Sequence, residues 1–403
     1  MIRILTAGES HGKALSVIVE GFPSNIPLDK DYIDKQLKRR QMGYGRGGRM
    51  QIETDTIEIL SGIRFGKTLG SPIAFNIENS DWKNWTHKMS HSPIKDKVEK
   101  ITIPRPGHAD LTGVSKYNFN DIRNSIERSS ARETAARVAG STVARKFLEE
   151  FGITVGSYVE NIGPIFPEKS FITKLYDNKL PKGFKAQQIA DKADKSQVRV
   201  LEKKQEEEII EQIKIAKKNG DTLGGQIVVI ATAVPAGLGS YMHFDKKLDA
   251  ALAFEFMSIN AIKSVEIGAG ACLSEVFGSE AHDEIIFENK EFNRKTNRAG
   301  GIEGGISTGL PIYVRAAMKP IATLMQPIQT VDLSTMKLVK ARRERSDFVA
   351  VPACGVIGEA AMAWVLAKFM LDKFGGDSLE ETKENYKNYT KQLNKRIKNN
   401  FKG

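Results

Sequence analysis

The amino-acid sequence predicts a mixed α/β or α+β sandwich built as one large domain. Segments with the two-residue alternation of strands form hairpin-like pairs, and the long helical segments are separate from them, unlike the regular order of a βαβ wheel. No fixed-period repeat and no linker rich in Pro, Gly or Ser divides the 403 residues. We therefore expect a single domain over residues 1–403, with a polar C-terminal tail from about residue 376.

Strands are predicted where apolar residues alternate with polar ones or gather in short runs. The N-terminal segment is interpreted as a first strand, because Glu9, His11 and Lys13 interrupt the apolar run that a signal peptide would need. Residues 50–63 show the two-residue alternation. Further strands are predicted at 71–78, 225–235 and 310–318.

Three helices are predicted, at 129–152, 202–221 and 354–376. In the first, Ser130 and Glu133 form a capping box ahead of an apolar stripe, which places free backbone amides and a positive dipole end beside arginines. In the second, Gly220 offers a C-cap. Residues 379–403 are polar with mixed charge, and they fit an exposed helix that frays into a tail.

The composition is that of a soluble globular protein, with 40% hydrophobic and 27% charged residues. No window approaches the roughly 18 unbroken apolar residues of a membrane helix, so we expect no membrane span. Cys272 and Cys354 lie in apolar surroundings rich in Gly and Ala. This predicts two buried free thiols in a reducing cytoplasm rather than a disulfide.

The charge balance favours an anionic partner. Sixty Lys and Arg against 49 Asp and Glu leave a net charge of +11, which fits nucleic acid, a membrane surface or phosphorylated small molecules. Much of the lysine lies on solvated helix faces, whereas arginine gathers in three clusters beside glycines and serines, where ligands bind. These clusters are at 38–50, 127–132 and 340–347.

Two histidines lie in segments that suit close contact with a ligand. His11 follows Ser10 in "AGESHGKAL", at the end of a predicted strand, although a turn histidine bonded locally is an equal alternative. His108 lies in "RPGHAD", on a bend that Pro106 and Gly107 make rigid, and its ring can exchange a proton near neutral pH. It is therefore a suitable acid for a phosphate leaving group.

No metal site is expected. His11 and His108 have no ligand partners near them in sequence. His87 and His91 have helical spacing but no third ligand nearby, so we interpret them as surface residues.

Two further segments could bind an anion. Five glycines precede the strand at 310–318, and Lys319 and Thr323 follow it, which indicates a turned cradle with a lysine and a hydroxyl suited to phosphate. No standard nucleotide-binding loop is present. Arg345 and Asp347 come just before the last apolar helix, and Asp347 is either a base or a surface ion-pair partner.

Seven segments, taken together and in this order, closely resemble the chorismate synthase family across nearly the whole chain. They are "GESHG", "RRQMGYGRGGRM", "RPGHAD", "ERSSARETAARVA", "GGIEGGISTG", "MKPIAT" and "ERSD". The resemblance implies an α+β fold of the β-α-β sandwich type, with helices between antiparallel sheets, in a cytoplasmic homotetramer. It also implies a lyase that performs the 1,4-anti elimination of phosphate from 5-enolpyruvylshikimate 3-phosphate, with reduced FMN and no net oxidation, as the last step of the shikimate pathway.

The same resemblance implies the site residues. The family's catalytic histidines, serines and carboxylate fall on His11, His108, Ser10, Ser129 and Asp347. Arg40 and Arg46 match positions for NADPH or for substrate anions, and we favour the substrate, with Arg49 beside them. The flavin contacts fall on Arg128, Ser129, Ser130, Asn260, Ala261, Gly304, Lys319, Pro320, Ile321, Ala322, Thr323 and Arg345.

The implied chemistry agrees with these residue types. The hydrogen lost from the substrate ring is a poor acid, and a reduced flavin can lend an electron, expel phosphate and take the electron back. We expect His11 to donate a proton to the departing phosphate and His108 to hold the reduced flavin near its N1/O2 edge. Asp347, with Ser10 or Ser129, would relay the proton from flavin N5. Many family members have proline after this aspartate, where Phe348 stands here.

Two other functions compete with this one. The +11 charge and the stretch "GYGRGGRM" would also fit a nucleic-acid-binding protein, although the chain returns at once to strand alternation. A flavin oxidoreductase that consumes nicotinamide is the other alternative. Whether the protein reduces FMN with NADPH or depends on a separate flavin reductase is open from the sequence.

Overall fold

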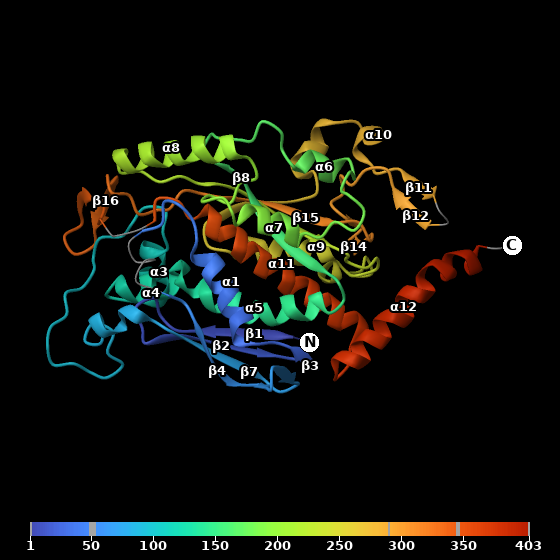
Figure 1. Cartoon of the computed structure of the whole chain (residues 1–403). Coiled ribbons are helices and arrows are strands. Elements are labelled where there is room, and N and C mark those ends of the chain that lie inside the picture. The colour runs from blue at the N-terminus through green and yellow to red at the C-terminus, as the bar shows by residue number, and fades with distance from the viewer. Residues whose placement is uncertain (1, 48–53, 289–290, 344–346, 402–403) are drawn as a thin grey trace.

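The structure, a computed structural model, describes residues 2–47, 54–288, 291–343 and 347–401. In this part of the chain, two four-stranded antiparallel sheets enclose a layer of helices (Figure 1). The α+β sandwich predicted from the sequence is therefore confirmed. The first sheet runs β1 (Arg3–Ala7), β2 (Ala14–Glu20), β7 (Ile73–Glu78), β4 (Ile57–Ser61). The second runs β10 (Ile262–Ile267), β15 (Ile312–Met318), β9 (Gly225–Thr232), β8 (Thr154–Ile162).

The helical layer consists of α1 (Lys30–Gln41), α5 (Thr134–Glu149) and α11 (Val351–Phe374). Helix α5 packs on the first sheet, α11 packs on the second, and the two helices contact each other. Gly140 lets α5 approach the sheet closely, since a Cβ there would lie 2.5 Å from Ile4 Cδ1. Helix α11 is long and apolar enough to cross a membrane, but 78% of its most apolar window is buried inside the molecule, as in the core helix of a soluble protein.

The other elements surround this frame. The remaining strands are β3 (Ser24–Pro27), β5 (Ile63–Arg64), β6 (Lys67–Leu69), β11 (Ile285–Glu288), β12 (Glu291–Arg294), β13 (Ile302–Glu303), β14 (Ile306–Ser307), β16 (Gln329–Asp332) and β17 (Lys337–Lys340). The remaining α-helices are α3 (Asp110–Tyr117), α4 (Arg123–Ser129), α6 (Ile172–Tyr176), α7 (Gln187–Ala193), α8 (Lys203–Asn219), α9 (Leu248–Met257), α10 (Gly278–Ala281) and α12 (Leu379–Asn400). Short 3-10 helices are η1 (Ser80–Asn84), η2 (Ala131–Glu133), η3 (Phe244–Lys246) and η4 (Gly270–Glu275).

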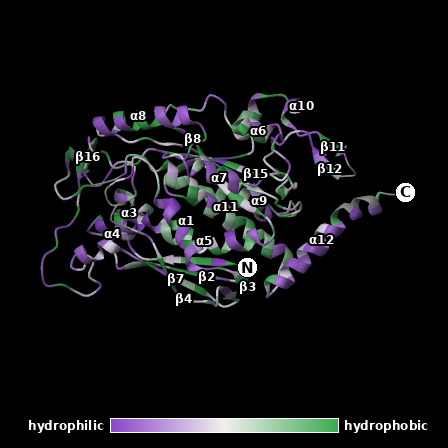
Figure 2. Ribbon diagram, viewed as in Figure 1, coloured by the Kyte–Doolittle hydropathy of each residue, from purple (hydrophilic) through white to green (hydrophobic). Residues whose placement is uncertain are grey.

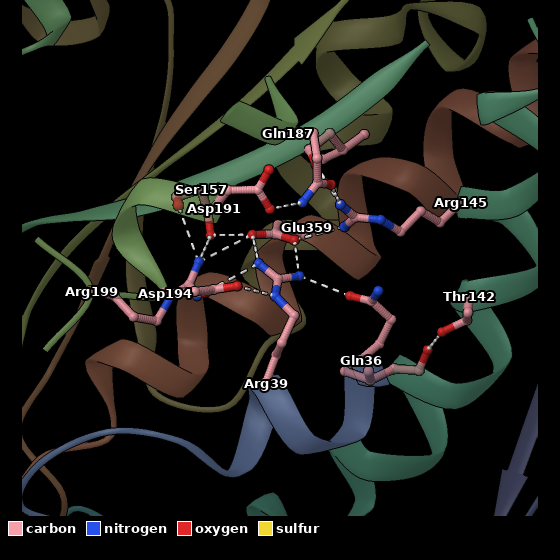
Figure 3. A network of polar contacts seen from close by, with 12 residues as sticks. Gln36, Arg39, Thr142, Arg145, Ser157, Gln187, Asp191, Asp194, Arg199 and Glu359 are labelled. Carbon is pink, nitrogen blue, oxygen red and sulfur yellow. Dashed lines mark hydrogen bonds and ion pairs between the residues drawn. The ribbon is translucent and has the colours of Figure 1, made fainter. Parts of the chain in front are cut away.

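A buried polar network, the Glu359 network, joins the helical layer to the second sheet (Figure 3). Glu359 of α11 is 1% exposed, and its two oxygens lie 2.6 and 2.9 Å from the guanidinium of Arg39 on α1. Arg145 of α5 and Arg199 reach the same carboxylate at 2.6 and 3.2 Å. Ser157 of β8 donates to it at 2.7 Å. One carboxylate thus ties α1, α5, α11 and β8 together.

The predicted strands are partly confirmed. Those at 71–78, 225–235 and 310–318 correspond to β7, β9 and β15. The N-terminal segment forms two strands rather than one, because Gly8, with φ of 106°, begins a turn between β1 and β2. Residues 50–53 lie outside the described chain, and the strand predicted there begins only at Ile57.

The predicted helices differ from the observed ones mainly at the start of the helix predicted over 129–152. The helix at 202–221 is confirmed as α8, and Gly220 caps it with φ of 68°. The prediction of one helix over 129–152 is wrong at its start, because Ser130 is extended and separates α4 from η2 and α5. Its hydroxyl accepts from Arg132 N at 3.3 Å, so it caps the short η2 turn rather than the long helix.

Two surface features complete this comparison with the sequence. The C-terminal segment is confirmed as an exposed helix, α12, whose residues are largely hydrophilic and which projects from the body (Figures 1 and 2). Cys354 is buried and free, as predicted, but Cys272 is exposed. Its apolar neighbours form the short turn η4, none of whose residues is buried, so local composition is misleading there.

Replacing Gly156 by alanine is expected to destabilise the fold. Gly156 lies on β8, where a Cβ would be 2.0 Å from the backbone oxygen of Ala186, and a backbone neighbour cannot rotate away. We expect the free energy of unfolding, measured by urea denaturation, to fall by about 1–3 kcal/mol. Gly278→Ala is the control, since its Cβ would meet nothing closer than His282 Nε2 at 3.7 Å. Equal stability of the two variants would contradict the close approach.

Candidate functional site

The turn between β1 and β2 presents Ser10 and His11 to helix α4. The backbone N–H of Ser10 donates to Glu127 O at 3.0 Å. Both the backbone N–H of His11 and its ring Nδ1 bind the Glu127 carboxylate, at 2.7 and 2.9 Å. Burial opposes ionisation of Glu127, but the hydrogen bonds and charge of His11 outweigh it, so the pKa of Glu127 lies below its usual value. The histidine is thus held by an ionised carboxylate.

Next to this turn lies the Asp55 cluster, which we define as Arg40, Asp55, Asn79 and Arg132. Asp55 is buried and shared, since its two oxygens lie 2.5 Å from Arg132 NH1 and 3.3 Å from Arg40 NH1. Arg132 Nε donates to Asn79 Oδ1 at 2.9 Å. Asn79 Nδ2 in turn donates to Gly12 O at 2.7 Å, which connects the cluster to the histidine turn.

The Asp55 cluster carries more positive than negative charge. Burial, together with the charges of Arg132 and Arg46, lowers the pKa of Arg40 to about 10 against the opposing effect of Asp55. Arg40 still carries its charge at neutral pH. Among the described contacts, Arg40 and Arg132 share the carboxylate of Asp55, and the charge of Asp347 also acts on Arg40. Buried guanidinium groups that gather in one place can bind an anion.

Asp347 lies beside this cluster, and its charge also acts on Arg40. Its Oδ1 accepts from Gly47 N at 2.6 Å, and its Oδ2 lies 3.2 Å from Arg46 NH1. The next residue, Phe348, donates its backbone N–H to Gly45 O at 2.9 Å. A proline could not make this bond, so the phenylalanine adds a contact that holds Asp347 in place.

His108 occupies a second part of the site. Gly107 has φ of 75°, as the rigid bend predicted from the sequence requires. His108 Nδ1 lies 2.5 Å from Asp110 Oδ1, and Arg105 Nε donates to Asp110 Oδ2 at 2.9 Å. Burial would raise the pKa of Asp110, but hydrogen bonds from His108 and Arg105 hold it far below its usual value. Arg105 NH1 also donates to Thr323 at 3.2 Å.

The segment after β15 closes this second part. Lys319 Nζ donates to Gly107 O at 2.5 Å, and Lys319 N donates to Ala261 O at 3.0 Å. Ala261 has φ of 67°, a backbone conformation that costs free energy for a residue with a side chain and that gathers at functional sites. Asn260 Nδ2 donates to Ser129 O at 3.3 Å.

Helix α4 joins the two parts, because Glu127 binds His11 and Ser129 receives the bond from Asn260. Helix α3, which follows His108, packs on α4, since a Cβ at Gly113 would lie 2.4 Å from Ser125 Oγ. The structure therefore gathers most of the residues expected from the sequence into one region, namely Ser10, His11, Arg40, Arg46, His108, Ser129, Ser130, Asn260, Ala261, Lys319, Thr323 and Asp347.

The other expected residues are placed differently. Arg128 is exposed and donates to Gly8 O and Thr6 O. Gly304 lies in the β13–β14 turn, away from α3 and α4 (Figure 1). Arg49 and Arg345 lie outside the described residues. Pro320, Ile321 and Ala322 connect Lys319 to Thr323, where Ile321 O accepts from Thr222 at 2.8 Å.

Two buried polar atoms in this region fit a polar, anionic ligand. Within the described chain, Arg46 Nε and Asn260 Oδ1 are buried without a hydrogen-bond partner. Such atoms are costly unless a ligand or water satisfies them. Arg46 Nε is a cationic donor that suits an anion, and Asn260 Oδ1 is an acceptor that suits the polar edge of a ring. The described residues contain no group of three or more His, Cys, Asp or Glu placed to hold a metal.

Several residues of the site were not expected from the sequence. Asp55 and Asn79 have no motif around them, and Trp85, which stacks on His11, lies in a polar segment. Glu127 directly precedes Arg128, which was expected in the site, and this position in the motif is the sequence feature that could have identified it. Arg39 belongs to the predicted arginine cluster but binds Glu359 in the core instead of a ligand.

Comparisons with known proteins agree on one family. A family model described as chorismate synthase matches residues 2–371. The chain is 54% identical over 391 residues to a chorismate synthase of Chlorobium phaeovibrioides, covering 96% of this chain and 98% of that one. It is 50% identical over 394 residues to that of Aquifex aeolicus, covering 97% and 98%. A crystal structure of a chorismate synthase matches with a TM-score of 0.78 and 42% identity, covering 98% of each chain.

Proposed function

The chain belongs to the chorismate synthase family, lyases that act on phosphate and complete the shikimate pathway, and we propose that it uses reduced FMN to eliminate phosphate from 5-enolpyruvylshikimate 3-phosphate. The observation that carries this proposal is the Asp55 cluster, whose two buried guanidinium groups adjoin both the His11 turn and the Arg46–Asp347 pair. Three distant segments meet there and bring buried guanidinium groups close together.

The charges of the ligands support this assignment. The substrate carries one phosphate and two carboxylates, and FMN adds another phosphate, so several cations must face one site. We assign Arg40 and Arg46 to the substrate anions, and Arg49, which lies outside the described residues, with them. Their use for NADPH is the alternative assignment.

The flavin is assigned to the part of the site that contains Asn260 Oδ1, the buried acceptor without a partner. When bound, reduced FMN supplies an electron to the substrate and recovers it. The residues that would hold it are Arg128, Ser129, Ser130, Asn260, Ala261, Gly304, Lys319, Pro320, Ile321, Ala322, Thr323 and Arg345. Gly304 lies in the β13–β14 turn, which is bonded to the start of α9, whereas Asn260 and Ala261 follow the end of that helix, so the contact of Gly304 is the least supported by the geometry.

The catalytic side chains then have distinct tasks. His11, whose Nδ1 is bound to Glu127, donates the proton on Nε2 to the departing phosphate. His108, whose ring is bound by Asp110, holds the reduced flavin near its N1/O2 edge. Asp347, with Ser10 or Ser129, carries away the proton lost from the ring. Ser129 already donates to Ser125 O at 2.6 Å, so a relay through it requires that bond to exchange.

The assembly and the reductant are further parts of the proposal. We infer a single-domain protein that assembles as a homotetramer in the cytoplasm, where its two free cysteines would stay reduced. The reductant is either NADPH acting on this chain or a separate flavin reductase. Anaerobic mixing of the protein and FMN with NADPH separates these cases, because only the first bleaches the flavin without added reductase.

The decisive experiment is anaerobic phosphate release from 5-enolpyruvylshikimate 3-phosphate, with and without photoreduced FMN. We expect one phosphate per chorismate, only with reduced flavin, and no net consumption of reductant. Nicotinamide consumed in proportion to product would indicate an oxidoreductase instead. Salt-sensitive retention on polynucleotide, without any flavin-dependent spectrum, would indicate a nucleic-acid-binding protein.

A further inference from the structure

His11 is enclosed by two residues to which the assignments above give no task of their own. Trp85 covers one face of the imidazole, with ring centroids 3.9 Å apart and 30° between the planes. Glu127 holds the edge of the ring through Nδ1 and also binds the backbone N–H of the same residue. The carboxylate is 3% exposed, so it acts in a region with little water.

The neighbours of Trp85 and Glu127 hold them in turn. Trp85 Nε1 donates to Asp81 Oδ2 at 2.9 Å. The guanidinium of Arg123 lies 5.0 Å from the centre of the Trp85 ring, and it also binds Glu127 at 3.2 Å. One arginine thus braces both the stacked indole and the carboxylate. Lys88 lies over the same indole, and Glu9 is the other carboxylate of the histidine turn.

We propose that Glu127 and Trp85 are positioning residues for His11, and that they hold its ring in the orientation and charge state from which Nε2 donates a proton. A carboxylate on Nδ1 favours the protonated ring and directs the second N–H away from itself. The indole excludes water from one face and attracts a cationic ring through its π-electrons. The catalytic part of this inference rests on the proposed function, in which His11 is the acid.

A purely structural role for Glu127 would be different. A buried acceptor for the backbone N–H of His11 could equally be an amide, since glutamine has the same length and a carbonyl oxygen. Only the ionised carboxylate biases the charge of the imidazole. Glu127→Gln therefore separates the two roles, because it keeps the shape and the acceptor but removes the charge.

The test uses the fluorescence of the full-length protein without added ligands. A protonated imidazole in contact with an indole quenches its emission, and the chain has three tryptophans. The wild-type spectrum minus that of Trp85→Phe isolates Trp85. We expect its emission to titrate with pH, and to lose this dependence in His11→Gln. In Glu127→Gln the midpoint should move to lower pH by about one unit or more, because the protonated ring has lost its opposite charge.

Glu9→Gln is the matched control, because it removes an exposed carboxylate of the same turn. The described carboxylate contact of the ring is with Glu127. The midpoint of the Trp85 emission in Glu9→Gln should stay within about 0.3 pH units of the wild-type value, because water screens an exposed charge. An unchanged midpoint in Glu127→Gln, or an equal shift in both variants, would overturn the proposal. So would Trp85 emission that does not depend on His11.

Turnover gives a second, independent measurement. We expect kcat of Glu127→Gln to fall at least about tenfold with KM little changed, as part of the hundredfold or more that a general acid contributes. Trp85→Leu should also lose kcat, and Trp85→Phe should recover most of it by restoring an aromatic ring. If the fluorescence shifts but no variant changes kcat, the positioning is real and His11 is not the acid. If wild type releases no phosphate, the proposed function fails while the fluorescence result stands.

Discussion

Glu359→Gln is expected to lower the free energy of unfolding at neutral pH by about 3–5 kcal/mol, the usual cost of removing one partner of a buried ion pair. Arg39, Arg145 and Arg199 all bind this carboxylate, at 2.6 to 3.2 Å, and each is nearly fully buried. Without it, Arg39 and Arg199 would keep Asp194 as a carboxylate partner, and Arg145 would keep Glu149 at 3.8 Å. Urea denaturation at fixed protein concentration measures the loss.

The loss of stability in Glu359→Gln should be full at neutral pH and smaller at low pH. Burial opposes ionisation of Glu359, but the charges of Arg39 and Arg145 dominate, so its pKa in the folded protein lies far below the ordinary value of 4.5. A carboxylate with a depressed folded-state pKa stabilises the fold above its unfolded pKa and loses that contribution as the pH falls. The difference in the free energy of unfolding between wild type and Glu359→Gln should therefore become smaller below about pH 4.5.

Glu207→Gln is the control for this prediction. Glu207 is exposed on α8 and lies 3.9 Å from Lys203, one turn away. Surface pairs of this kind contribute about 0.3–0.5 kcal/mol, so the variant should differ little from wild type at any pH. If Glu359→Gln were as stable as this control, the fold would not depend on the Glu359 network shown in Figure 3.

His11→Ala and His108→Ala are each expected to lower turnover about a hundredfold or more, the typical contribution of a positioned acid or base. The reason differs between them. Under the proposed function, alanine at 11 would remove the proton donor for the departing phosphate, whereas alanine at 108 would remove the ring that Asp110 binds and that we assign to the flavin. Anaerobic phosphate release with photoreduced FMN, at saturating substrate, measures both.

His243→Ala is the matched control, because His243 is exposed and its ring contacts only its chain neighbours Phe244 and Asp245 among the described contacts. It should keep near wild-type turnover. Near wild-type rates for His11→Ala or His108→Ala would instead refute the role of that histidine. Binding of oxidised FMN by each variant, followed by its absorbance, shows whether the site is still formed.

Local patterns accounted for much of the fold and for the identity of the motifs. Strand alternation and apolar runs correctly predicted β7, β9 and β15, and Gly220 correctly ended α8, because these features depend on residues close in sequence. The bend at Gly107 was predicted for the same reason. The break at Ser130 was not, since the start of that helix is decided by contacts such as Arg132 with Asp55, across 77 residues.

The sequence by itself determined the fold class, the motif residues and the family. Only the tertiary structure decided their partners, because hydrogen bonds and ion pairs between distant segments leave no periodic signal. Glu127 meets His11 across 116 residues, and Glu359 meets Arg39 across 320. Arg39 and Arg40 are neighbours in one cluster, yet Arg39 binds Glu359 in the core and Arg40 binds Asp55 in the candidate site. Consecutive residues on a helix are about 100° apart, so one segment can serve both the core and the site.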